Sequence, residues 1–266
     1  MTGLAAPFLA AVVAALWIAA CLACFARLKS MRPPRRTDFK MGLADAALFL
    51  CVILFSVSLP GIVLRRVPRE VFGGDAGAGF AGAALSYLLM AGGYFAYSAC
   101  ASSKPVLARP APFMGAGLVL RGGACMAASV PLFAALAWVW LFILFCAGAD
   151  IVRQDVVEAF LAVEGAFMKA VAFVSVAALA PVAEEIVFRG VVYGALKSRC
   201  GGVCAAALSG VLFASLHFSA YAFLPLAALG VFFALLYEKF GDIRAPIGAH
   251  AAFNIMNIAC LWLNVF

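Results

Sequence analysis

The sequence predicts an all-α protein, a polytopic transmembrane helical bundle of about eight spans, because each span needs roughly 20 apolar residues. Of the 266 residues, 67% are hydrophobic and 12% are charged, whereas soluble proteins carry about 25% charged residues. A soluble fold of this size could not hide so much apolar surface from water. The net charge of +7 has a separate explanation, because Lys and Arg gather in the cytoplasmic loops of membrane proteins. The composition therefore excludes soluble proteins, and no nucleic-acid partner is expected.

The first predicted span covers about residues 4–26 and is longer than the apolar part of a signal peptide. A strongly basic loop follows it, in which Asp38 stands against six positive residues: Arg27, Lys29, Arg32, Arg35, Arg36 and Lys40. Basic loops stay in the cytoplasm. The pattern therefore places this loop inside and the N-terminus outside.

Three further spans are predicted at about residues 43–64, 77–99 and 124–148. The apolar residues 111–120 are too few to cross a bilayer, so they are predicted to form an interfacial or re-entrant piece. The charged residues of the stretch 150–164 are mainly acidic, and the stretch is placed on the outer side of the membrane, opposite the cytoplasm. This placement agrees with the alternation of successive loops between the two sides of the membrane, counted from the first basic loop.

The remaining spans are predicted at about residues 166–183, 202–222, 223–237 and 245–264. There is no internal repeat and no low-complexity tail. Residues 1–266 are therefore predicted to form a single integral membrane domain, in which residues 1–148 make up the N-terminal transmembrane helices.

Charges inside the apolar runs indicate where chemistry takes place, because an ionisable group in a span costs roughly 2.5–3.5 kcal/mol and usually marks function. Glu184, Glu185 and Arg189 lie in one such run. On a helix, Glu185 and Arg189 share a face and can pair, while Glu184 is rotated about 100° away. A carboxylate in an apolar site suits a general base. The alternative is a salt bridge at the membrane edge that only caps a helix.

Both histidines of the chain, His217 and His250, also lie in apolar runs, and Asn254 follows His250 by one helical turn. A lone histidine in a membrane is more often a helix–helix hydrogen bond than a catalyst. Here the polar groups all fall within residues 184–254, which favours one shared pocket. Glu184 with His217 could then take a proton from water, and His250 with Asn254 could stabilise an oxyanion. Alternatively, Glu and His side chains could hold a divalent metal.

Three motifs carry a family resemblance: E-E-x-x-x-R-G from Glu184 to Gly190, F-x-x-x-H from Phe213 to His217, and H-x-x-x-N from His250 to Asn254. Together they resemble the motifs of the CPBP family, which comprises CAAX prenyl protease-like proteins and bacteriocin-processing or immunity (Abi) proteins. The resemblance covers roughly residues 170–265 and implies a CAAX protease-like catalytic core at residues 166–265.

The resemblance implies an intramembrane endopeptidase of a bacterial plasma membrane, with its active site facing the cytoplasm. It gives Glu184 the role of water-activating base with His217 as partner. It makes Glu185 and Arg189 supports of the site. His250 and Asn254 then form the pair that stabilises the transition state.

The resemblance leaves the cofactor open, because such proteins are labelled metalloproteases while a glutamate mechanism without metal is also proposed for them. The chain lacks the H-E-x-x-H arrangement typical of zinc peptidases. A divalent metal such as zinc and no metal at all are therefore both retained. The expected partners are a peptide or membrane-protein substrate and the lipid bilayer, while the oligomeric state is not predicted. Two other functions stay open, a transporter or proton-relay protein using the same pocket and a non-catalytic bacteriocin-immunity protein.

Overall fold

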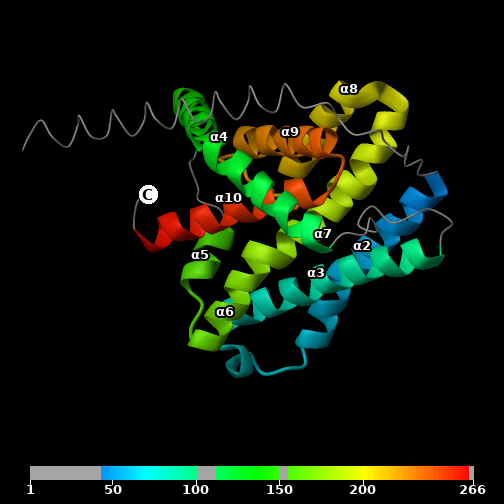
Figure 1. Ribbon diagram of the computed structural model, residues 1–266. Helices are drawn as coiled ribbons and strands as arrows, with labels where there is room; N and C mark the ends of the chain where they lie inside the picture. The colour runs from blue at the N-terminus through cyan, green and yellow to red at the C-terminus, as the bar shows by residue number, and fades with distance from the viewer. Residues whose placement is uncertain (1–42, 101–111, 150–154, 264–266) are drawn as a thin grey trace, which may run out of the picture.

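The predicted apolar runs fold into helices throughout the computed structural model, which describes residues 43–100, 112–149 and 155–263 (Figure 1). No strand occurs in these ranges, so the all-α fold class is confirmed for them. The predicted span at 4–26 and the basic loop after it lie outside the described residues. The first elements are α2 (Leu43–Leu64), the 3₁₀ helix η1 (Arg69–Phe72), α3 (Asp75–Cys100), α4 (Pro112–Cys146) and the short α5 (Asp155–Leu161).

The second part of the fold begins with one long helical stretch that is interrupted by two π-helical segments. It consists of α6 (Ala166–Val174), the π segment η2 (Ser175–Leu179), α7 (Ala180–Glu185), the π segment η3 (Ile186–Val192) and α8 (Tyr193–Ser215). The last helices are α9 (Phe223–Phe240) and α10 (Arg244–Trp262). In Figure 1, α7 lies near the centre of the bundle, and it packs against both α3 and α10.

Four described segments are long and apolar enough to cross a membrane: Asp75–Tyr97, Ala116–Cys146, Ala166–Ser215 and Phe223–Phe240. The stretch Phe49–Leu64 of α2 is apolar but shorter. The helices thus fit a polytopic bundle, while the predicted count of about eight spans is not confirmed within the described ranges.

The structure corrects the prediction that residues 111–120 form a separate interfacial or re-entrant piece. From Pro112 onward they are the first part of α4, which continues to Cys146 as one helix. Arg121 suggested a boundary, but its side chain is exposed on the helix surface and does not interrupt the helix. Packing against α10 provides the reason for this continuity, because tertiary contacts contribute more to helix stability than local sequence does.

The predicted span 166–183 and the first part of the predicted span 202–222 both lie in the long helical stretch Ala166–Ser215, which a kink at Gly201 divides into two helices. Gly201 marks a kink within α8, where its backbone has φ 78° and ψ 169°. Only glycine adopts such a conformation without strain. The chain therefore changes direction at Gly201 close to where the second of these spans was expected to begin.

Two glycines allow α4 and α10 to approach closely. A Cβ atom on Gly122 would overlap the carbonyl oxygen of Ala245, and a Cβ atom on Gly248 would overlap that of Val119. Small residues permit this kind of backbone approach between membrane helices. Because α10 also carries His250 and Asn254, the α4–α10 contact helps to position both side chains.

Gly248→Ala is expected to lower stability by about 1–3 kcal/mol, the usual cost of forcing extra volume into a packed site. The matched control is Gly117→Ala on α4, where an added Cβ atom would meet nothing within 4 Å. That variant should be neutral or more stable by up to about 1 kcal/mol, since alanine favours helix over glycine. Thermal unfolding in detergent micelles measures both variants, and equal midpoints would contradict the close contact.

Candidate active site

The two adjacent glutamates end α7, between the two π-helical segments. Each π turn holds more residues than an α turn, and such segments frequently occur at functional sites. Glu185 is fully buried, with 0% of its surface exposed, whereas Glu184 is partly accessible. The two carboxylates therefore have different surroundings. This agrees with the prediction that Glu184 and Glu185 point in different directions from the helix axis.

The predicted ion pair between Glu185 and Arg189 is present and buried. Arg189 Nη1 donates to Glu185 Oε1 at 3.1 Å, and Arg189 Nε lies 3.0 Å from Glu185 Oε2. A further donor, Nη2, bonds the carbonyl oxygen of Gly230 on α9 at 2.8 Å. The guanidinium carbon also lies 5.2 Å from the ring centre of Phe233 and 5.3 Å from that of Phe213. These contacts compensate a charge that would otherwise be costly to bury.

Close packing of α8 and α9 makes the Gly230 contact possible. Gly210 and Gly230 face one another, and a Cβ atom on either glycine would press into the backbone of the other helix. The two backbones can therefore approach closely here, as small residues allow. The carbonyl group of Gly230 is thereby held within reach of Arg189.

His250 joins the ion pair to the second carboxylate. Its Nδ1 lies 3.0 Å from Glu185 Oε1, and its Nε2 lies 3.8 Å from Glu184 Oε2. Because an ionised carboxylate can only accept hydrogen bonds, Nδ1 is assigned as the donor to Glu185, and Nε2 is turned toward Glu184. Phe233 stacks on the imidazole with ring centres 5.0 Å apart and an angle of 21°. The ring is therefore fixed both by a hydrogen bond and by packing.

Glu184 is the less constrained carboxylate of the site. Its side chain is 18% exposed, and its Oε2 atom, although buried, has no hydrogen-bond partner among the described residues. An oxygen with free lone pairs beside an imidazole nitrogen can accept a proton from water.

His217 lies in the turn that follows α8, two residues after Ser215, and is exposed. Its Nδ1 lies 2.8 Å from the carbonyl oxygen of Phe213, and the two ring centres are 4.7 Å apart. Phe213 also contacts His250, with ring centres 5.7 Å apart. The described residues contain no hydrogen bond or ion pair between His217 and Glu184, so the predicted partnership of these two residues remains a prediction.

Asn254 lies one turn beyond His250 on α10, as predicted, but its visible contact is with the backbone. Its Nδ2 donates to the carbonyl oxygen of Val176 in η2 at 2.7 Å. The structure thus brings Glu184, Glu185, Arg189 and His250 together. The Asn254 amide instead forms a hydrogen bond with the backbone of the π-helical segment η2.

Sequence reasoning missed two groups that complete the site, the Gly230 carbonyl and the Phe233 ring. Gly230 lies 41 residues from Arg189, so helical periodicity could not relate the two. One signal was available, because a guanidinium has five N–H donors and a single carboxylate cannot satisfy all of them. A buried arginine therefore required a further acceptor.

The donor set was also tested for a metal site. Over the described ranges, no group of three His, Cys, Asp or Glu side chains lies close enough together to hold a metal ion. Protein zinc sites use at least three such ligands. The described residues therefore provide no set of three ligands for the divalent metal named above, and metal dependence stays a prediction.

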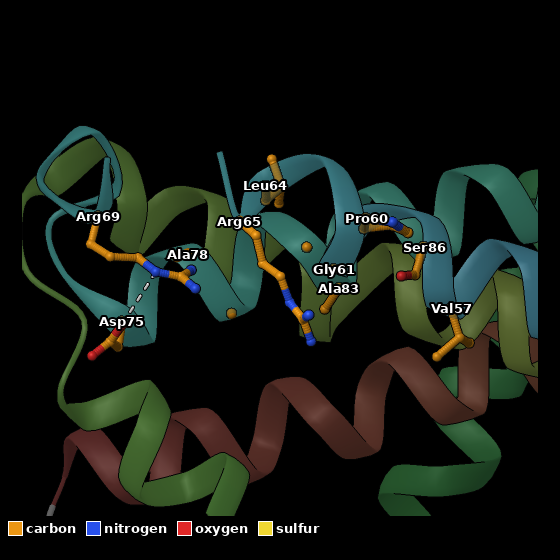
Figure 2. Close-up of a pocket in the computed structure, with 12 residues that line it drawn as sticks. Val57, Pro60, Gly61, Leu64, Arg65, Arg69, Asp75, Ala78, Ala83 and Ser86 are labelled. Atoms are coloured by element: carbon orange, nitrogen blue, oxygen red, sulfur yellow. Dashed lines mark ion pairs between the residues drawn. The ribbon is translucent and has the colours of Figure 1, made fainter. Parts of the chain in front are cut away.

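A separate cavity of about 430 Å³ lies between α2 and α3 (Figure 2). Its walls include Val57, Leu64 and Arg65, and at one end Arg69 pairs with Asp75 at 3.4 Å. None of the six predicted site residues lines it. Although concave pockets are a usual place to look for catalysis, the paired glutamates and both histidines lie elsewhere, so the carboxylate and histidine cluster is the better candidate.

Comparison with known proteins finds similarity in the same region. Residues 166–256 match the family model described as Type II CAAX prenyl endopeptidase Rce1-like. A protein of Bacillus subtilis (strain 168) named "Putative membrane peptidase YdiL" is 36% identical over 74 residues, which cover 28% of this chain and 30% of that protein. No solved structure matches the chain. Together with the apolar helices, these findings make the chain an integral membrane protein whose residues 166–256, with all six predicted site residues, match the Rce1-like family.

Proposed function

We propose that the chain is a CAAX-protease-like intramembrane endopeptidase that hydrolyses a peptide bond at or near the cytoplasmic membrane face. One observation carries the proposal. The buried Arg189–Glu185 pair holds His250 Nδ1, so that His250 Nε2 is turned toward the unpartnered oxygen of Glu184. The family match supports the same class of reaction.

In the proposed reaction, Glu184 is the general base. It takes a proton from water while the water oxygen bonds to the carbonyl carbon of the substrate. When the carbon–nitrogen bond breaks, Glu184 returns that proton to the leaving nitrogen and becomes a carboxylate again. A well-placed general base of this kind contributes about 10²–10⁴-fold to the rate.

His250 is proposed to support the charge that develops during this step. Its Nδ1 is anchored on Glu185, and a protonated Nε2 can donate a hydrogen bond to the oxyanion of the tetrahedral intermediate. The negative charge of Glu185 stabilises the imidazolium that this requires. His217, with Nδ1 held by the Phe213 carbonyl, keeps Nε2 for contact with the substrate at the exposed rim.

The proposed substrate is a peptide or a membrane protein, and the proposed location is a bacterial plasma membrane. The test is cleavage by the purified chain in liposomes, with a farnesylated CAAX peptide and the same peptide without the lipid as probes, followed by mass spectrometry. We expect a wild-type product that is absent with Glu184→Gln. Proton flux in these liposomes without any cleavage would instead favour the transporter alternative.

The cleavage reaction is expected to be insensitive to metal removal, because the described side chains offer no group of three ligands. Incubation with EDTA and with 1,10-phenanthroline, followed by the same mass-spectrometric assay, should leave the rate unchanged. Elemental analysis of the purified protein provides the independent control. Loss of cleavage that returns on adding zinc would contradict the metal-free reaction.

A further inference from the structure

The carbonyl group of Val176 needs a donor from outside its own helix. In the π segment η2 the Ala180 N–H bonds the carbonyl oxygen of Ser175, five residues earlier. The next N–H in this series would belong to residue 181 and would bond Val176. That residue is Pro181, which has no N–H. The carbonyl of Val176 therefore lacks its backbone donor one turn before α7 begins and about two turns before the glutamates.

Asn254 supplies the missing hydrogen bond. Its Nδ2 lies 2.7 Å from the Val176 oxygen, which is a short and direct contact. Membrane helices tolerate proline where a neighbouring helix satisfies the backbone group that the proline frees. Here α10 is that neighbour, and it packs against both η2 and α7.

The contact lies next to the catalytic carboxylates along both helices. Pro181 is the second residue of α7, and Glu184 and Glu185 follow about one turn later. On α10, His250 is one turn from Asn254 and bonds Glu185. One face of α10 therefore holds the segment 176–185 at two points, one on its backbone and one on a carboxylate.

From this geometry we infer that Asn254 is a positioning residue: it replaces the backbone donor that Pro181 lacks and thereby sets the direction in which α7 presents Glu184 and Glu185. This differs from the transition-state role that the family resemblance implies, in which the same amide would contact the substrate. The hydrogen bond itself does not depend on any activity. Its effect on catalysis rests on the proposed peptidase function.

A double-mutant cycle between Asn254 and Pro181 tests the inference. Asn254→Ala leaves the Val176 carbonyl without its donor, whereas Pro181→Ala restores an N–H to the helix. We expect Asn254→Ala alone to lower the thermal unfolding midpoint in micelles. In the Pro181→Ala background the same replacement should lower the midpoint much less, because the restored backbone donor satisfies the freed carbonyl. Two residues that share one hydrogen-bond acceptor should show such coupling.

A second measurement reports on Glu184 directly and needs no substrate. Dicyclohexylcarbodiimide reacts with protonated carboxyl groups in apolar sites, and mass spectrometry of the labelled peptide gives the rate at each pH. Asn254→Ala should shift the pH profile of Glu184 labelling, and Pro181→Ala combined with Asn254→Ala should return it toward the wild-type profile. A side chain that only stabilised the fold would leave this profile in place.

If the Asn254→Ala protein is not found in the membrane, Asn254→Ser serves as the second variant. The serine hydroxyl group is smaller than the amide but keeps a hydrogen-bond donor on the same face of α10. Equal effects of Asn254→Ala in the Pro181 and the Pro181→Ala backgrounds, on both midpoint and labelling, would overturn the inference. So would normal midpoint and labelling for Asn254→Ala combined with a loss of cleavage alone, because that result assigns the amide to the transition state. The unfolding midpoint and the Glu184 labelling profile can both be measured even if the chain does not cleave peptides. Failure of the positioning role of Asn254 and failure of the peptidase proposal can therefore be distinguished.

Discussion

Glu184→Gln is expected to abolish peptide cleavage, with kcat/KM lower by about 10²–10⁴-fold, the usual contribution of a general base. Glutamine keeps the size of the side chain and the position of one oxygen, but it cannot take a proton from water. The replacement should not disturb the fold, because the Glu184 side chain is partly accessible and Glu185, not Glu184, pairs with Arg189. Single-turnover cleavage in liposomes measures the loss.

The matched control is Glu70→Gln on η1, whose side chain is exposed and remote from α7. This variant should cleave at the wild-type rate, which excludes a general effect of removing a negative charge. Both variants should show wild-type membrane insertion and unfolding midpoints. Undiminished cleavage by Glu184→Gln would remove the central residue of the proposed reaction.

Arg189→Ala is expected to destabilise the protein strongly, by about 3–5 kcal/mol, because it leaves the buried Glu185 carboxylate without its counter-ion. The change also removes the hydrogen bond to Gly230 and the packing on Phe213 and Phe233. We therefore expect little protein in the membrane and a much lower unfolding midpoint in micelles. The amount of inserted protein and the midpoint are the measurements.

Arg66→Ala is the control, since the Arg66 side chain is exposed at the end of α2, and it should behave as the wild type. A double variant, Glu185→Gln with Arg189→Met, separates the two roles of the pair. It removes both charges from the core and should recover much of the stability, as uncharged replacements of buried pairs often do. Its cleavage should stay low because His250 loses its ionised partner. Wild-type stability of Arg189→Ala would contradict the buried pair.

Local patterns in the sequence predicted the features that depend on one helix. The span predicted at 43–64 coincides with α2, and the pair Glu185–Arg189 follows directly from helical spacing. The position of His250 beside the glutamates required the further argument that polar groups in a membrane gather in one pocket. The structure bears that argument out for His250 through its contact with Glu185.

The features that escaped prediction depend on contacts between distant segments. The π-helical segments on both sides of α7 have no signature in apolar periodicity. Pro181, in the first turn of α7, leaves the Val176 carbonyl of η2 without a backbone donor, and Asn254 of α10 satisfies it. The continuity of α4 through residues 112–120 likewise depends on α10, which approaches it at Gly122. Periodicity describes one helix at a time, so such pairings could not be read from it.

The facing glycines of α8 and α9 have a consequence for biosynthesis. Arg189 finds its backbone acceptor only when α9 has docked against α8 at Gly210 and Gly230. The Arg189–Glu185 pair orients His250, so a newly made chain acquires its ordered carboxylates only after its last helices have inserted. The proposed peptidase activity would therefore be absent until α9 has docked, which would protect neighbouring proteins at the insertion site.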